Sequence, residues 1–132
     1  YRTLGEWAQD HFDESVVRDP ADLAGFLMSM TAAGAENLAY WRTYIAIWDK
    51  SLRDPVLAAE RDGWIDDALE RIAAFVLKRK PDCADPGAVA RHMLAMVQGI
   101  SVQILFKPDS WSAESVRTAL AVEIDQVLAR TS

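Results

Sequence analysis

The most apolar stretch of the chain covers residues 88–106, where apolar side chains go around the whole circumference of a predicted helix. The stretch has no proline and one glycine, which predicts a helix of about five turns. A helix that is apolar all round has to be buried all round. The rest of a short chain can cover one side only, so we expect a second copy to cover the other. Two adjacent stripes carry this pattern: Val89, Met93, Met96, Ile100 and Ile104, and beside them Ala90, Leu94, Val97, Ser101 and Leu105.

Five further segments repeat apolar residues at intervals of three and four, which is typical of amphipathic helices. Asp19-Pro20 and Asp54-Pro55 each predict an N-cap followed by proline at the first helical position, and Ser112 predicts the cap of the last helix. No stretch alternates with period two over the length of a strand. We therefore predict an all-α fold of about six helices in an orthogonal or antiparallel bundle. The expected helices cover residues 3–18, 20–31, 36–52, 55–78, 88–106 and 113–128, with a polar connector at 80–87.

The length of 132 residues predicts a single domain, residues 1–132. The chain is 51% hydrophobic and 26% charged, which is the balance of a globular protein. The net charge of −6 opposes contact with phosphates, so this segment by itself is not expected to bind nucleic acid. Because the first residue is Tyr1 rather than methionine, we expect the chain to be part of a longer protein.

No uninterrupted apolar run reaches about 18 residues, so we expect no membrane span. Cys83 is the one cysteine and cannot form an internal disulfide. Its place in a polar connector suits a reducing compartment, and the cytoplasm is the expected location.

Groups that could carry out chemistry are sparse. His11 and His92 lie far apart, and the chain has neither a metal-binding His motif nor a glycine-rich phosphate loop. Cys83 lies near Asp82 and Asp85, which would raise the pKa of its thiol and make it a poor nucleophile. Adjacent carboxylates at 66–67 point about a hundred degrees apart on a helix. We predict no catalytic residue, no metal site and no cofactor, and therefore no enzyme.

Aromatic residues are abundant instead. Trp41, Tyr44 and Trp48 share one predicted helix, and Trp64 lies on the next. These rings could simply fill the core between small residues. They could also line an apolar cavity with a few polar tips, the usual composition of a small-molecule site. His11 has the same two interpretations, as a core histidine or as a ligand contact.

The second half of the chain resembles the C-terminal regulatory domain of TetR-type transcriptional repressors. The resemblance rests on the order and spacing of Leu52-Arg53-Asp54-Pro55, a long helix with Trp64, a Pro/Asp connector, and the pattern Gly99-x-x-x-Gln103-x-x-x-x-Pro108. In that family, an N-terminal helix-turn-helix unit binds operator DNA and the following helices enclose an inducer pocket. The last two helices pair with those of a second subunit as a four-helix bundle.

The resemblance implies a homodimer that senses a small apolar or aromatic effector, with a DNA-binding domain upstream of residue 1. The candidate pocket residues are His11, Phe12, Trp41, Tyr44, Trp48, Trp64, Met93 and Met96. The candidate dimer interface consists of Leu94, Val97, Gly99, Ser101, Leu105, Leu120, Ile124 and Val127.

The mechanism implied by the resemblance is a population shift. Ligand binding would favour a dimer whose DNA-binding heads have the wrong spacing, which would release operator DNA. One alternative is a stand-alone helical small-molecule-binding or adaptor dimer without a DNA role. Another is an enzyme of a helical-bundle type, which the sequence does not support and which only a finding of stoichiometric metal would revive.

Overall fold

The computed structural model describes residues 22–130, and this part of the chain consists of α-helices joined by short connections, without a strand. The all-α prediction is therefore confirmed. The expected helix at residues 3–18 lies outside the described residues. The five described helices are α2 (Leu23–Met30), α3 (Ala35–Ser51), α4 (Pro55–Arg79), α5 (Pro86–Phe106) and α6 (Ala113–Arg130).

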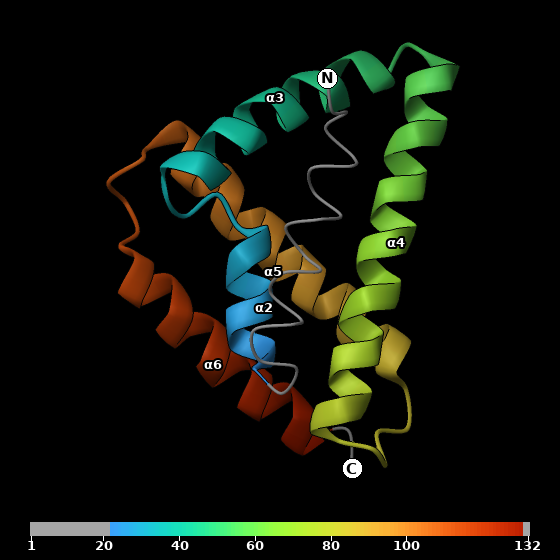
Figure 1. The fold of residues 1–132 in the computed structure, drawn as a ribbon, viewed down its shortest axis with the longest axis vertical. Coiled ribbons are helices and arrows are strands. Elements are labelled where there is room, and N and C mark those ends of the chain that lie inside the picture. The colour runs from blue at the N-terminus through green and yellow to red at the C-terminus, as the bar shows by residue number, and fades with distance from the viewer. Residues whose placement is uncertain (1–21, 131–132) are drawn as a thin grey trace.

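The helices surround the short α2 (Figure 1). α3 and α4 meet at a corner and diverge from it, and α5 crosses behind α2. α4 and α5 pack against each other, as do α2 and α6. Side chains from two non-parallel helices can therefore meet in the corner between α3 and α4.

Aspartate caps start three of the helices. Asp54 accepts hydrogen bonds from the backbone N–H groups of Val56 and Leu57, with Pro55 at the first position of α4, as predicted. Asp85 and Pro86 repeat this arrangement at α5, which begins two residues before the predicted 88–106.

The predicted start of the second helix was wrong. α2 begins at Leu23 and its N-cap is Asp22, not Asp19, which lies outside the described residues together with Pro20. The Asp22 carboxylate accepts from the Gly25 N–H at 2.8 Å and also pairs with Arg117 of α6 at 3.0 Å. Burial alone would raise the pKa of Asp22, but these two donors outweigh it and hold the pKa below its usual value. A tertiary ion pair thus reinforces this cap.

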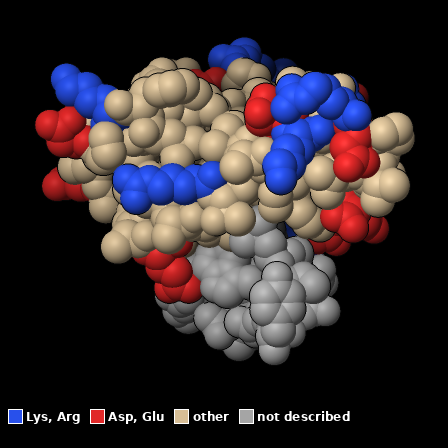
Figure 2. All heavy atoms as spheres, turned by 90° about the horizontal axis from the view of Figure 1, so that it is seen from above, with Lys and Arg blue, Asp and Glu red and all other residues tan. Residues whose placement is uncertain are grey.

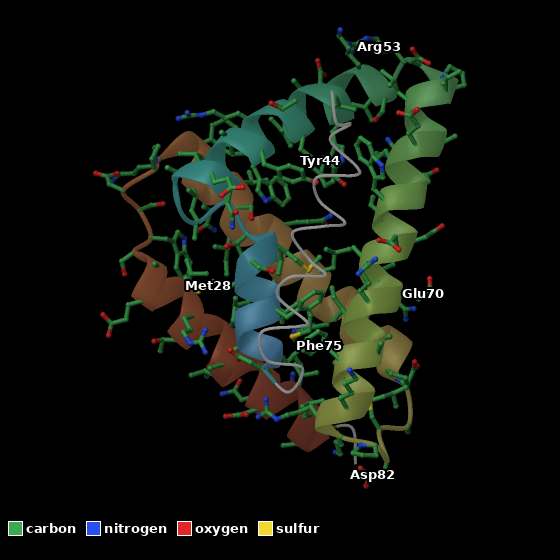
Figure 3. All side chains as sticks on the ribbon, in the orientation of Figure 1. Met28, Tyr44, Arg53, Glu70, Phe75 and Asp82 are labelled. Atoms are coloured by element: carbon green, nitrogen blue, oxygen red, sulfur yellow. The ribbon has the colours of Figure 1, made fainter. Side chains whose placement is uncertain are left out.

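The core forms where α2, α4 and α5 meet. Phe26 of α2 and Phe75 of α4 stack with ring centroids 4.4 Å apart, and both rings are buried. Met93 and Val97 of α5 are fully buried in the same core. Figure 3 shows Phe75 pointing from α4 toward α2, whereas Glu70, one and a half turns earlier, points outward. α5 therefore contacts all four other described helices and contributes buried side chains to the core.

Two features fix the turn between α2 and α3. Gly34 has a φ of 92°. Residues that carry a Cβ atom adopt this backbone conformation only with strain, whereas glycine adopts it freely. Two residues earlier, the Ala32 N–H donates to the buried Ser101 hydroxyl of α5 at 3.0 Å. The start of α3 is therefore attached to α5 as well as to α2.

Among the described residues, α5 is the one helix long and apolar enough to cross a membrane, with a mean hydropathy of 1.3 over its most apolar window. The core helix of a globular protein has the same composition, and α5 takes that position here. Only 44% of the window is buried within the chain. The other positions of α5 are half-buried or exposed, and the exposed ones include Ala95, Gly99 and Phe106.

Candidate functional site

Five aromatic side chains gather in the corner between α3 and α4. We call Tyr40, Trp41, Tyr44, Trp48 and Trp64 the aromatic cluster. The first four lie on α3 at intervals that bring them to one face of the helix, and Trp64 reaches them from α4. Figure 3 shows Tyr44 pointing from α3 toward α4, where its ring meets Trp64. The helix periodicity and the α3–α4 corner together bring the cluster into one place.

Tyr44 is the centre of the cluster. Its ring centroid lies 5.4 Å from Trp41, 4.9 Å from Trp48 and 5.3 Å from Trp64, with the last pair stacked at 29°. Tyr40 stacks on its other side at 5.4 Å. These separations lie within the range in which aromatic pairs attract each other. Trp41 and Tyr44 are buried, while Trp48 and Trp64 are only half-buried and form the outer part of the cluster.

The two tryptophans of α3 differ in how their indole N–H groups are used. Trp41 Nε1 donates to the Met30 carbonyl at 2.8 Å. Trp48 Nε1 is buried and has no hydrogen-bond partner in the part of the chain that the structure describes. It approaches Tyr44 closely enough to lower the pKa of that phenol, yet outside hydrogen-bond geometry. A buried donor without a partner costs about 1–3 kcal/mol, so the cluster holds one unused polar atom.

A half-buried arginine lies beside the cluster. Arg61 Nη1 donates to the Ser51 hydroxyl at 2.9 Å, and that hydroxyl donates to the Trp48 carbonyl at 2.6 Å. The other side of the guanidinium pairs with Asp62, whose carboxylate lies 3.0 Å from Nη2 and is largely exposed. The Arg61 charge is thus fixed near the end of α3 that carries Trp48.

The two tyrosines stay neutral at physiological pH. Burial raises the pKa of Tyr44, and the Trp48 indole and the Arg61 charge offset only part of that rise. Burial also raises the pKa of Tyr40, and the neighbouring Tyr44 raises it further. The cluster therefore offers ring faces, an unused N–H donor and a nearby positive charge.

The structure brings together four of the predicted pocket residues: Trp41, Tyr44, Trp48 and Trp64. Met93 is fully buried on α5 and Met96 is half-buried on the same helix. His11 and Phe12 lie outside the described residues. Sequence reasoning missed Tyr40, Ser51 and Arg61 as members of this site; Arg61 precedes Trp64 by three residues and therefore shares its side of α4.

Most of the predicted interface side chains lie inside the single chain. Val97, Ser101 and Leu120 have no exposed surface, and Ile124 has 1%. Leu94 and Val127 are also buried, Leu105 is half-buried, and Gly99 is exposed. The fully buried side chains face the α2–α6 core because α2 packs between α6 and α5. Surface available to a second copy must therefore come from other positions of the same helices.

Uncharged residues occupy several exposed or half-buried positions on α5 and on α6. We call these positions the outer α5–α6 face, and its residues on α5 recur at intervals of three and four. Two contacts hold the helices together beside it: His92 Nε2 lies 2.8 Å from Glu123 Oε1, and Trp111 Nε1 donates to Gln103 at 2.8 Å. Phe106 is 86% exposed and Val122 is 50% exposed. The face consists of Ala95, Gly99, Val102, Phe106, Thr118 and Val122.

Charges elsewhere are mixed. Figure 2 looks onto the molecule from above the view of Figure 1, and basic and acidic side chains alternate there with uncharged surface between them. Among residues 22–130, no group of three or more His, Cys, Asp or Glu side chains could hold a metal ion. Cys83 is buried although its connector is polar. Within residues 22–130, the aromatic cluster and the outer α5–α6 face are uncharged, and Leu52 and Val56 at the α3–α4 corner are further exposed apolar side chains.

Residues 20–129 match the family described as BetI-type transcriptional repressor, C-terminal. No curated protein and no solved structure matches the chain.

Proposed function

Because the chain belongs to the family of BetI-type transcriptional repressor C-terminal domains, we propose that it senses a small molecule and pairs with a second copy of itself. The family match confirms the TetR-type resemblance and is the observation that carries this proposal. A DNA-binding unit upstream of residue 1 would complete the repressor, and the cytoplasm would be its location.

The aromatic cluster is the proposed effector site. Its half-buried rings, Trp48 and Trp64, offer stacking faces next to buried aromatic surface. Small-molecule sites combine such apolar walls with a few polar atoms that orient the ligand. Trp48 Nε1 and Arg61 could supply those polar atoms. Met93, Met96, His11 and Phe12 remain proposed as further lining.

The outer α5–α6 face is the proposed dimer surface. α5 is apolar and only partly buried within the described chain, and the exposed Phe106 and Val122 are large apolar side chains. Gly99 and Ala95 are small, so a second pair of helices could approach closely. The proposal keeps the predicted helix pair and Gly99 but moves the contact to the exposed side.

The proposed regulation is a population shift between two arrangements of the dimer. One arrangement spaces the DNA-binding heads for successive major grooves, and the effector binds the other more tightly. Operator affinity then falls by the difference in ligand affinity, typically about 1–3 kcal/mol. α3 and α4 carry the effector site, while α5 connects them to the dimer surface, so one helix links both events.

The test uses the full-length repressor. Sedimentation equilibrium should show dimers at micromolar concentration, and an operator fragment should be released when an effector occupies the aromatic cluster. A monomer would reject the pairing. A full-length protein without any DNA-binding unit would favour the stand-alone adaptor dimer instead.

A further inference from the structure

The unused donor in the aromatic cluster indicates which class of effector the cluster would accept. We propose that the effector is a planar aromatic compound with an oxygen acceptor, preferably a carboxylate, which accepts the indole N–H of Trp48 and lies within the field of Arg61. This inference rests on the proposed effector site and adds its chemical class.

The first support is the contrast between two indoles on one helix. Trp41 Nε1 and Trp48 Nε1 are both buried, and Trp41 Nε1 donates to the Met30 carbonyl at 2.8 Å. Within residues 22–130, Trp48 Nε1 lies near the Tyr44 hydroxyl but has no hydrogen-bond partner. Buried polar atoms in native proteins are nearly always paired, so an unpaired one calls for a reason. A ligand oxygen would give Trp48 the partner that the protein leaves out.

The second support is the sign of the nearby charge. Aromatic cages can also bind cations through their ring faces. Here, however, the ionised group among residues 22–130 whose charge acts on Tyr44 is the Arg61 guanidinium, which is held in place by Ser51 at 2.9 Å. Arg61 would repel a cation and attract a carboxylate. Its present partner, Asp62, is 64% exposed and can turn to water when a ligand anion arrives.

The third support is the geometry of the rings. Tyr44 and Trp64 lie within 29° of parallel, and Trp48 is tilted by 52° from Tyr44. Trp64 and Trp48 are half-buried, so a flat ligand can stack on them without first unpacking Trp41. An aliphatic ligand would leave these flat faces poorly covered.

Calorimetric titration with three probes tests this assignment: 2-naphthoate, its methyl ester, and tetramethylammonium. We expect 2-naphthoate to bind most tightly, the ester to bind more weakly, and tetramethylammonium not to bind. Trp48→Phe should weaken 2-naphthoate by roughly tenfold, because a hydrogen bond to a charged group is lost. Arg61→Gln should weaken the binding of 2-naphthoate but leave the binding of the ester unchanged.

Matched controls separate the site from general damage. Trp111→Phe removes an indole from the α5–α6 connection, and Arg53→Gln removes an exposed arginine from the α3–α4 corner. Both should bind 2-naphthoate like the wild type. If Trp48→Phe does not fold, Arg61→Gln compared on the acid and the ester still decides the question.

The inference would be overturned if tetramethylammonium binds more tightly than 2-naphthoate, or if neither naphthalene probe binds. It would also be overturned if the Trp48 and Arg61 variants bind 2-naphthoate as tightly as the wild type does. The proposed function fails separately, when the full-length protein is monomeric or does not bind operator DNA. An effector that releases operator DNA but lacks an acceptor would overturn the inference and leave the proposed function standing.

Discussion

The indole N–H of Trp41 donates to the backbone carbonyl of Met30 at 2.8 Å, which joins the middle of α3 to the last residue of α2. Trp41 is 4% exposed and Met30 is 6% exposed, so water does not compete for this bond. The bond sets the angle at which α3 leaves the short turn after α2. The position of the whole aromatic cluster therefore depends on it.

Trp41→Phe should destabilise the fold more than Trp48→Phe. Both changes remove the same part of a side chain, but only the first leaves a buried carbonyl without its donor, which costs about 1–3 kcal/mol. Trp48→Phe removes an N–H that has no partner. Urea unfolding followed by circular dichroism measures both free energies of unfolding. Equal losses would mean that the Met30 bond contributes nothing beyond ring packing.

Ser101→Ala should lower the free energy of unfolding by about 1–3 kcal/mol, because the buried Ala32 N–H loses its acceptor. Ser110→Ala, at an exposed position after α5, is the matched control and should have little effect. Chemical denaturation gives both values. A Ser101 variant as stable as the control would show that Ala32 finds another acceptor or that the turn rearranges.

Gly99→Glu should leave the protomer folded and separate the proposed dimer. A side chain at Gly99 meets nothing within 4 Å in the single chain. In the dimer, glutamates from both copies would face each other, which should weaken association roughly a hundredfold. Analytical ultracentrifugation over a range of concentrations gives the dissociation constant.

Two other substitutions serve as controls for that experiment. Gly63→Glu adds the same charge at another open helical glycine, on α4, and should stay dimeric. Val97→Glu places an unpaired charge at a fully buried position and should unfold the chain at a cost of about 3–5 kcal/mol. If Gly99→Glu associates like Gly63→Glu, the outer α5–α6 face is not the interface.

Stability should fall at alkaline pH because of Tyr40 and Tyr44. The folded chain raises the pKa of both phenols above the ordinary value of 10.0, so the unfolded chain loses these protons first. The stability that the two neutral phenols contribute is fully present below pH 10, and it is lost as the pH rises through their raised pKa values in the folded chain. Thermal unfolding at several pH values above 9 measures the decline, and Tyr40→Phe should make it shallower. If Tyr40→Phe loses stability with rising pH as steeply as the wild type, Tyr40 does not cause the decline.

The helices were predictable because their signals are local. Asp54-Pro55 marks the start of α4 by sequence alone, and the spacing of Trp41, Tyr44 and Trp48 puts these rings on one face. The Asp85-Pro86 pair carries the same local signal for α5, although its place in a Pro-rich connector suggested a loop. For α2, both Asp19 and Asp22 are suitable caps, and the partner of Asp22, Arg117, lies 95 residues away. Long-range partners of this kind cannot be read from spacing.

The aromatic cluster was predictable in part. Periodicity assigns Trp41, Tyr44 and Trp48 to one face, but the role of Arg61 depends on its contact with Ser51 across the α3–α4 corner. The division of α5 into inner and outer faces was not predictable. Apolar residues surround the helix, so their spacing does not show which side faces the core. Only packing shows that Val97 faces the core while Gly99 faces outward.

If the partly covered α5 pairs with a second copy as proposed, the stability of the protein should depend on its own abundance. In the proposed dimer, folding of α5 and pairing share one equilibrium, so mass action makes stability depend on protein concentration. Diluting the chain should lower its melting temperature, whereas a fully covered monomer would melt at the same temperature at any concentration. A cell that makes little of this repressor would then hold it closer to unfolding and to proteolysis, and expression level would set the lifetime of each copy.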